Sequence, residues 1–439
     1  MATDIKTGKK LLVKIDDLDS EWRGIAVING MECIVPGLYP GDQAVVEVVA
    51  VSQHHPRCFC EFTQLQSSGN NRITARCGIY PQCSGCPGIA LKYKSGVAWK
   101  KAKVEAVFQR KVKFYHSPKI LGYRSKTKLV AGRDNHGKKI FGGYQKGTHS
   151  LMPLDHCPVV NQNLQELYHP LQFVIRQLEP YDELQETGFV RSVFLKTNSA
   201  GEIHLTFVVF RELSKLEKDI FLQLSEINSV KGININLHTQ KTNRLVGERE
   251  YTIFGKEYLI ESNSVVDYAV NSTGFSQINL EIAEKAYGKI VDWAGTESEK
   301  ILDLFCGNGP IALALAKKGH TVTGVEREGL AVKLAKSIGA TVDFIEMDAR
   351  NPNFISEFIH KEKFGVIVLN PPRSGLKDEL CKSINQSTVK NLIYMSCSVF
   401  SLNRDIERLK ESGFKIIKMV GFDMFPHTPH FETLVHLQR

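Results

Sequence analysis

Short apolar runs separated by polar turns dominate the first 65 or so residues. The stretches LLVKIDDL, GIAVING, ECIVPG and QAVVEVVAVS are rich in valine and isoleucine, and Gly, Pro and Asp separate them. No helical period holds across them, so the pattern favours strands joined by tight turns. We predict a small all-β barrel over residues 1–66.

One stretch near the end of this region, HHPRCFCEF, has His54, Cys58 and Cys60 close together. We expect it to be a strand edge. Metal binding by these three side chains is the alternative.

The middle of the chain has a different pattern. From Arg76 to about Lys94 the composition shifts to Cys, Gly and Pro, and the helical stretch VAWKKAKVEAVFQRKV follows with a strongly basic exposed face. Short strands then alternate with one or two helices over residues 118–260. We therefore predict a mixed α+β central domain over residues 67–262, and we expect the helix near 92–115 to pack on the C-terminal domain.

Regular alternation begins after about residue 270. The stretch INLEIAEKAYGKIVDWA has the apolar spacing of a helix. Strand-like runs such as KILDLF, TVTGVE, VIVLN and NLIYMS then alternate with helical runs such as PIALALAKKG and SLNRDIERLKESG. This alternation predicts a Rossmann-like α/β domain over residues 263–439, built on a doubly wound, mostly parallel sheet.

Composition is that of a folded globular protein. Of the 439 residues, 42% are hydrophobic and 23% are charged. No apolar run approaches the roughly 18 residues that span a membrane, and the start MATDIKTGKK has no signal-peptide core. We expect a cytoplasmic protein with no membrane association, and a monomer.

Positive charge is concentrated in one segment. Between Lys92 and Lys146 there are 16 lysines and arginines against two acids, Glu105 and Asp134, although the whole chain is only +9. Aromatic residues are interleaved with these cations. Because cations neutralise the phosphates of nucleic acids and aromatic rings stack on unpaired bases, the segment favours a phosphate-binding surface over an ordinary solvated face.

Polar or glycine-rich tips follow successive strands of the predicted C-terminal sheet. In open α/β sheets ligands bind at the carboxyl ends of the strands. The glycines after the first strand let the backbone turn at a helix N-terminus, and an acid after the second is placed to hold ribose hydroxyls. The tips are DLFCGNGP (303–310), Glu326, Asp348, NPPR (Asn370–Arg373) and Ser396–Cys397.

These tips and two further motifs resemble the RNA uracil-C5 methyltransferases, which make 5-methyluridine in ribosomal and transfer RNA. GFSQIN (274–279) is similar to the F-x-Q-x-N element of that family, and DLFCGNG, NPPRSG and MSCS follow in the family's order. MFPHTPHFETL (424–434) is similar to its terminal motif. The resemblance implies a methyltransferase that uses S-adenosyl-L-methionine.

The resemblance also implies roles for individual residues. Cys397 would be the nucleophile that adds to C6 of uracil, and Glu432 the base that removes the C5 proton. A buried structural cysteine and a solvent-facing strand residue are the plain alternatives for these two positions. The residues implied in cofactor binding are Gln277, Phe305, Gly307, Glu326, Asp348 and Asn370. Those implied in substrate binding are Phe275, Gln277, Asn370 and Arg373.

Three features of the sequence, at four positions, depart from the family pattern. Asn370 stands where the family usually has Asp, and N-P-P also occurs in enzymes that methylate exocyclic amines, so amine methylation stays open. Ser398 and Val399 replace an Asn-Pro pair that often follows the cysteine, and Pro310 replaces a polar residue. Amine enzymes need no nucleophilic cysteine, so Cys397 favours uracil chemistry.

A cysteine set precedes these motifs. Cys77, Cys83 and Cys86 have the spacing C-x5-C-x2-C, and Cys157 stands in a distant C-P pair. Four thiolates are able to hold a zinc ion or an iron–sulfur cluster, and spacing alone does not separate the two. The set is similar to the 4Fe-4S ligands of the ribosomal RNA branch of the family, and the N-terminal barrel resembles an OB-like TRAM domain.

The resemblance therefore implies methylation of 23S ribosomal RNA. Two alternatives remain, namely the same chemistry on transfer RNA and an iron–sulfur RNA-binding protein that has lost catalysis.

Overall fold

The computed structural model describes residues 5–183, 185–242, 244–296 and 298–439. The chain divides into two compact units. Unit 1 comprises Met1–Lys103, Gln145–Gly147 and Phe425–His430, and unit 2 comprises Val104–Tyr144, Thr148–Met424 and Phe431–Arg439. The division at residues 1–66, 67–262 and 263–439 stays a prediction.

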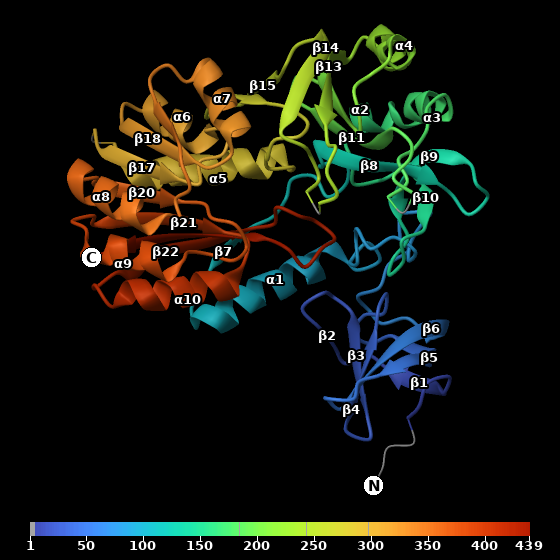
Figure 1. Ribbon diagram of the computed structural model, residues 1–439. Coiled ribbons are helices and arrows are strands. Elements are labelled where there is room, and N and C mark those ends of the chain that lie inside the picture. Colours follow the sequence, from blue (N-terminus) through green and yellow to red (C-terminus); the bar gives the residue numbers. More distant parts are fainter. Residues whose placement is uncertain (1–4, 184, 243, 297) are drawn as a thin grey trace. The chain divides into compact units, whose positions relative to one another are not determined.

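Unit 1 contains a curved sheet of short strands (Figure 1). Its order is β1-β5-β6-β4-β3-β2, and apolar side chains from these strands form a core of their own. Because β6 lies between β5 and β4, HHPRCFCEF does not form a strand edge and that expectation was wrong. The strands are β1 (Lys10–Lys14), β2 (Asp17–Leu18), β3 (Gly24–Ile28), β4 (Met31–Val35), β5 (Gln43–Val51) and β6 (Arg57–Ser67).

The Cys-rich segment packs onto this sheet through two tyrosines. The Tyr39 hydroxyl donates to the Pro87 carbonyl at 2.6 Å, and the Tyr80 hydroxyl donates to the Gly37 carbonyl at 3.0 Å. Helix α1 (Tyr93–Phe108) follows it and continues into unit 2.

Unit 2 contains a mixed sheet in the order β10-β9-β8-β11-β12-β13-β14. Helix α3 and the residues Ile220 and Phe221 of α4 contribute to the apolar core on this sheet, as the α+β pattern predicts. The elements are β8 (Lys126–Arg133), β9 (Lys139–Tyr144), β10 (Leu151–Pro153), α2 (Gln162–Gln165), α3 (Tyr168–Arg176), β11 (Val190–Thr197), β12 (Ile203–Val209), α4 (Lys215–Leu222), η1 (Gln223–Glu226), β13 (Val230–Leu237) and β14 (Arg249–Gly255). A hairpin of β15 (Leu259–Ser262) and β16 (Asp267–Val270) follows.

The second sheet of unit 2 has the order β19-β18-β17-β20-β21-β23-β22-β7. Strands β19 to β21 in this order run parallel, whereas β23 is antiparallel to both of its neighbours. Helices α5 and α6 pack together on one face, and α9 and α10 pack together on the other (Figure 1). This is the predicted α/β domain. Its strands are β7 (Lys113–Tyr115), β17 (Lys300–Leu304), β18 (Thr321–Glu326), β19 (Asp343–Glu346), β20 (Val366–Leu369), β21 (Asn391–Ser396), β22 (Lys415–Phe422) and β23 (Glu432–Gln438), and its helices are α5 (Leu280–Ala294), α6 (Pro310–Lys317), α7 (Gly329–Ile338), α8 (Pro352–Glu362), α9 (Asp378–Gln386) and α10 (Val399–Lys410).

Two elements of this sheet region were not predicted. Helix α8 connects β19 to β20, where the sequence pattern passed from one strand to the next. Strand β7 adds to the edge of the sheet beside β22, although about 300 residues separate the two in the chain. Among the described residues, no helix is long and apolar enough to cross a membrane.

Candidate active site

The turn after β17 forces the backbone into left-handed conformations. Phe305, Gly307 and Gly309 have φ values of 63°, 56° and 84°. A bulky residue rarely adopts such an angle, so Phe305 is a strained position of the kind that clusters at functional sites. A Cβ on Gly309 would lie 2.6 Å from the Phe344 ring, whereas a Cβ on Gly307 would meet open space. The turn therefore leaves room beside Gly307.

Glu326, at the end of β18, joins this turn to its own strand. Its Oε2 accepts from the Gly307 amide at 3.0 Å, and its Oε1 accepts from the amides of Arg327 at 2.7 Å and Glu328 at 3.0 Å. Burial is the main reason that the pKa of nearby Asp303 rises to about 8; the Ala312 amide opposes the rise, and the Glu326 carboxylate adds to it. The hydrogen bond from Gly307 to Glu326 thereby connects the ends of β17 and β18, close to the two acidic side chains Glu326 and Asp303.

Asp348, beyond the end of β19, is engaged by its own neighbour. The Arg350 guanidinium lies 2.7 Å from the Asp348 carboxylate. The hydrogen bond from this guanidinium is the main reason that the pKa of Asp348 falls to about 2. Asp348 is therefore ionised, and part of its acceptor capacity is already used.

The register of β21 and β23 brings the two predicted catalytic residues together. Ser396 pairs with Thr433 in this antiparallel ladder, so one step further along the ladder Cys397 faces Glu432. Facing residues on neighbouring strands have Cβ atoms roughly 5 Å apart. Cys397 is half-buried and Glu432 is only 4% exposed. Cys397 and Glu432, which are 35 positions apart in sequence, thus lie at neighbouring ends of β21 and β23.

Charges around this pair set its acidity. Burial and, to a smaller extent, the charge of Glu432 raise the pKa of the Cys397 thiol to about 11, while Arg373 opposes the rise through its charge and a hydrogen bond. Burial also raises the pKa of Glu432 to about 8, against a hydrogen bond from Gln277 and the charge of Arg373. Arg373 is exposed at the surface and still acts on both groups. Its cationic side chain favours the thiolate and the carboxylate.

Gln277 and Phe275 occupy the loop before α5 in contrasting ways. Gln277 is 5% exposed and hydrogen-bonds to Glu432, whereas Phe275 is 68% exposed. An exposed ring beside a buried polar centre is available for stacking on a base.

Lys126 holds this loop from β8. Its ammonium donates to the carbonyls of Thr273 at 3.1 Å and Gly274 at 2.6 Å. Burial lowers its pKa to about 7, and the charge of Lys196 adds to this effect. The sequence analysis missed this role because Lys126 stands almost 150 residues before the loop, and a lysine in the strand pattern RSKTKLV was the only signal.

Two of the three departures from the family motifs fit their local geometry. Pro310 is the first residue of α6, where a missing amide costs nothing. Ser398 is the N-cap of α10 and accepts from the Ser401 amide at 3.4 Å. Asn370 follows β20, and its backbone amide donates to the Leu304 carbonyl at 3.3 Å, a bond that Asp would make equally well. Pro310 and Ser398 therefore suit the backbone around them, and the structure gives no reason for Asn in place of Asp at position 370.

Residues 92–439 match the family described as tRNA (uracil-5-)-methyltransferase. The chain belongs to this family. An uncharacterized RNA methyltransferase of Listeria monocytogenes is 27% identical over 99% of both chains, and one of Bacillus cereus (strain ATCC 10987 / NRS 248) is 28% identical over 100% of this chain and 98% of its own.

A solved structure of a related enzyme is similar to this chain over nearly its whole length. The tRNA (uracil-54, C5)-methyltransferase of Pyrococcus abyssi, crystallised with S-adenosyl-L-homocysteine, is 25% identical. It matches with a TM-score of 0.79 over 97% of this chain and 99% of its own. The α/β methyltransferase fold with mixed sheets is confirmed.

The predicted cysteine set of this methyltransferase is distributed over both units. Cys77, Cys83 and Cys86 are half-buried in unit 1, and Cys157 is half-buried in unit 2. The Gly85 amide donates to the Cys83 sulfur at 3.3 Å. Among the described residues, the three thiols that lie within 4.8 Å of one another are different ones, Cys33, Cys58 and Cys60.

The basic segment is less uniformly exposed than its sequence suggests. Lys100 is buried, donates to the Phe425 carbonyl at 2.9 Å and lies over the Trp22 ring at 5.4 Å. Lys126 is likewise committed to backbone carbonyls. For these two lysines the prediction of a phosphate-binding role was wrong, because their ammonium groups donate to backbone carbonyls of the protein itself.

Proposed function

We propose that this chain methylates C5 of a uridine in RNA, with Cys397 as nucleophile and Glu432 as general base. The observation that carries the proposal is the register of β21 and β23, which pairs Ser396 with Thr433 and so sets the thiol opposite the carboxyl group. Both groups have pKa values that respond to each other or to Arg373. Perturbed titratable groups that converge on one strand edge are typical of active sites.

The residues around the β17 turn fit S-adenosyl-L-methionine. The turn leaves open space at Gly307, and the Glu326 carboxylate retains lone pairs beyond its three backbone donors, which suit ribose hydroxyls. Phe305, Asp348, Asn370 and Gln277 complete the proposed cofactor-binding set. When bound, S-adenosyl-L-methionine supplies the methyl group that C5 takes up.

The chain's own residues account for the remaining steps. The Cys397 thiolate adds to C6, and the electrons of the C5–C6 double bond make C5 nucleophilic. After C5 is methylated, Glu432 removes the C5 proton. The C6–S bond then breaks, which restores the double bond and frees the thiolate. Phe275 is proposed to stack on the extruded base, while Gln277, Asn370 and Arg373 bind its edge or the adjoining phosphate.

We propose 23S ribosomal RNA as the target and the cytoplasm as the location. The all-β sheet of unit 1, which we interpret as a TRAM domain, and the Cys77, Cys83, Cys86 and Cys157 pattern support this choice. We propose these cysteines as ligands of a 4Fe-4S cluster, with zinc as the alternative. The proposed reaction transfers no electrons, so the cluster's role would be structural or in RNA contact.

Transfer RNA is the second candidate target. The family description names it, and the Pyrococcus abyssi enzyme that matches nearly the whole chain acts on uracil-54 of tRNA. The chemistry at Cys397 and Glu432 would be the same for either RNA.

Mass mapping of both RNAs from cells with and without the gene tests the proposal. Loss of a 5-methyluridine from 23S RNA, restored by the wild-type gene and not by Cys397→Ala, is the expected result. Loss from transfer RNA alone would overturn the ribosomal target and keep the chemistry. No loss of 5-methyluridine from either RNA would overturn the proposed function and favour a binding protein or an amine methyltransferase.

A further inference from the structure

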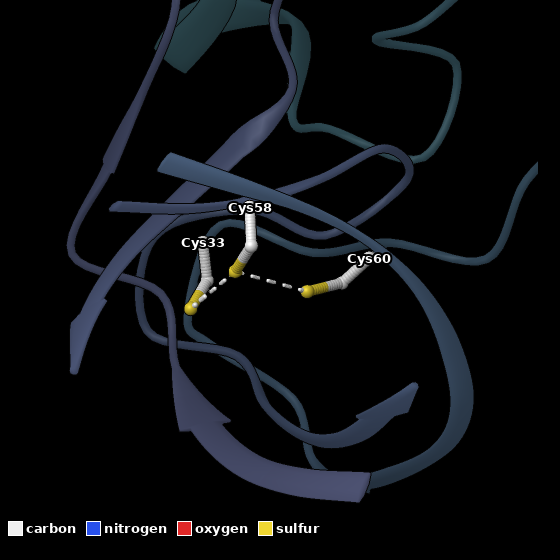
Figure 2. Close-up of side chains that lie close together, drawn as sticks. All are labelled: Cys33, Cys58 and Cys60. Atoms are coloured by element: carbon white, nitrogen blue, oxygen red, sulfur yellow. Dashed lines mark hydrogen bonds between the residues drawn. The ribbon is translucent and has the colours of Figure 1, made fainter. Parts of the chain in front are cut away.

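Three cysteine thiols converge inside the sheet of unit 1 (Figure 2). Cys33 comes from β4, and Cys58 and Cys60 come from β6. Cys33 and Cys58 are paired across the two parallel strands, and Cys60 shares the face of Cys58 because side chains two apart on a strand point the same way. The Cys58 sulfur lies 3.3 Å from that of Cys33 and 3.7 Å from that of Cys60.

The surroundings of the three thiols are apolar. All three are at most 1% exposed, and the core cluster to which they belong consists of aliphatic side chains such as Val35, Val46 and Val48. His54, the nitrogen ligand that the sequence suggested for this region, is exposed to solvent. Among the described side chains of this core, sulfur is therefore the atom type that could bind a metal ion.

The size of the sulfur triangle matches that of a metal–thiolate centre. Two of its sides are 3.3 and 3.7 Å, and the third is within 4.8 Å. For third sides between 3.3 and 4.8 Å, the point equidistant from the three sulfurs lies about 2.0–2.4 Å from each, compared with metal–thiolate bonds of about 2.3 Å. A single ion at that point would be in bonding range of all three sulfurs.

We propose that Cys33, Cys58 and Cys60 form a site for one soft metal ion in three-coordinate sulfur geometry, and that copper(I) is the kind of ion it takes. Thiolate ligands select soft ions such as copper(I). Zinc in structural sites takes four ligands in a tetrahedron, whereas among the described residues three thiols converge here. This site is separate from the proposed methyl-transfer chemistry and does not depend on it.

The competing explanation is that each thiol fills space as a small hydrophobic group. That explanation accounts for burial, since valine or alanine would serve equally well in this core. It gives no reason for three sulfurs to share one centre, and it predicts that loss of one of them leaves metal binding unchanged.

A copper(I) titration of the reduced full-length protein, against a chromophoric copper(I) chelator, separates the two explanations. We expect Cys58→Ala to bind one equivalent fewer than the wild type. X-ray absorption should show three sulfurs at about 2.2–2.3 Å around the copper that this substitution removes. Copper(I) should also raise the melting temperature of the wild type more than that of the variant.

Matched variants identify the source of the lost equivalent. Cys381→Ala removes a buried thiol from α9 in unit 2 and should keep the wild-type stoichiometry, and Cys58→Val should repeat the loss while it preserves core volume. Cys77→Ala alters one of the proposed cluster ligands. The double variant Cys77→Ala, Cys58→Ala should bind one equivalent of copper(I) fewer than Cys77→Ala alone. Equal stoichiometry in the wild type and in a folded Cys58→Val variant would overturn the site.

Discussion

The side chain of Cys397 is a weak acid at rest and still the best nucleophile at the site. Burial holds its pKa at about 11, and Arg373 works against that rise. We expect Cys397→Ala to lower methylation more than about a thousandfold, because no other group at the strand edge is able to form the C6 adduct. RNA binding should change little, since the thiol is half-buried. Methyl transfer from labelled S-adenosyl-L-methionine and filter binding of RNA give the two readouts.

The control for that experiment is Cys381→Ala, which removes a buried thiol that our proposal gives no role in the reaction. It should keep nearly full activity. Turnover by Cys397→Ala at the wild-type rate would exclude this cysteine as the nucleophile.

The protonation state of Glu432 sets the pH dependence of the reaction. Its pKa of about 8 means that the carboxyl group is mainly protonated at neutral pH and gains its role as base only as the pH rises. The single-turnover rate at which methylated RNA is released from Cys397 should therefore increase as the pH passes through about 8. Glu432→Gln cannot remove the C5 proton, so the methylated RNA should stay attached to Cys397 and migrate with the protein on a denaturing gel.

The adduct of Glu432→Gln needs its own control. The double variant Cys397→Ala, Glu432→Gln should form none. A wild-type rate that is flat between pH 6.5 and 9, or a Glu432→Gln variant that releases product normally, would contradict the role of Glu432.

Individual residues were predictable where a motif carried them. Cys397, Glu432 and Gln277 stand in short motifs, and the structure brings these three residues together. The cysteine triad around Cys33 and the buried roles of Lys100 and Lys126 were not predictable, because each depends on partners far away in the chain. Local pattern cannot tell a lysine that faces solvent from one that donates to a distant carbonyl.

At the level of elements, β8 supports the loop that carries Phe275 and Gln277. Lys126 on this strand donates to two carbonyls of the loop, and a Met of similar length would leave both without that donor. We expect Lys126→Met to lower kcat about 10- to 100-fold, since a shift of about 1 Å in a catalytic group has effects of this size. Steady-state kinetics, with circular dichroism to verify folding, measure it.

Lys128, two positions further along β8, provides the comparison. It is half-buried on the same strand, and its pKa is lowered by burial alone. Lys128→Met should leave kcat within about threefold of the wild type. Equal losses in both variants would mean that Lys126 supports β8 in general and not the loop.

Helices and strands could be predicted from the sequence where the periodicity of apolar residues and the positions of turn residues indicated the same boundaries. The strands of the α/β domain ended close to the predicted tips, and Asn370 follows directly after β20. Helix α8 and strand β7 were missed for different reasons. The run that forms α8 has a weak period between two clear strands, and β7 owes its sheet position to β22. Pairing between distant strands is a tertiary choice that local propensity does not encode.

At the scale of the whole molecule, the division of the chain into two units does not follow the order of the sequence. The segments Gln145–Gly147 and Phe425–His430 belong to unit 1, although the surrounding chain belongs to unit 2. The Gly88 amide donates to the His427 carbonyl at 2.9 Å within unit 1. Part of the connection between β22 and β23, which leads directly to Glu432, therefore belongs to unit 1.

The charge distribution of the whole molecule leads to a prediction about salt. Lys92 and Lys94 are exposed members of the basic segment, unlike Lys100. If they neutralise phosphates, replacement of both by Gln should weaken RNA binding about 3- to 10-fold at 0.15 M salt. The slope of log K against log salt should also fall in magnitude by about 1.4, since each phosphate contact with a single strand contributes about 0.7.

Lys336→Gln is the matched control, because Lys336 is exposed on α7 outside the basic segment. It should leave the slope unchanged. A double variant of Lys92 and Lys94 with the wild-type slope would mean that these cations form an ordinary solvated face, and that RNA is held by other residues.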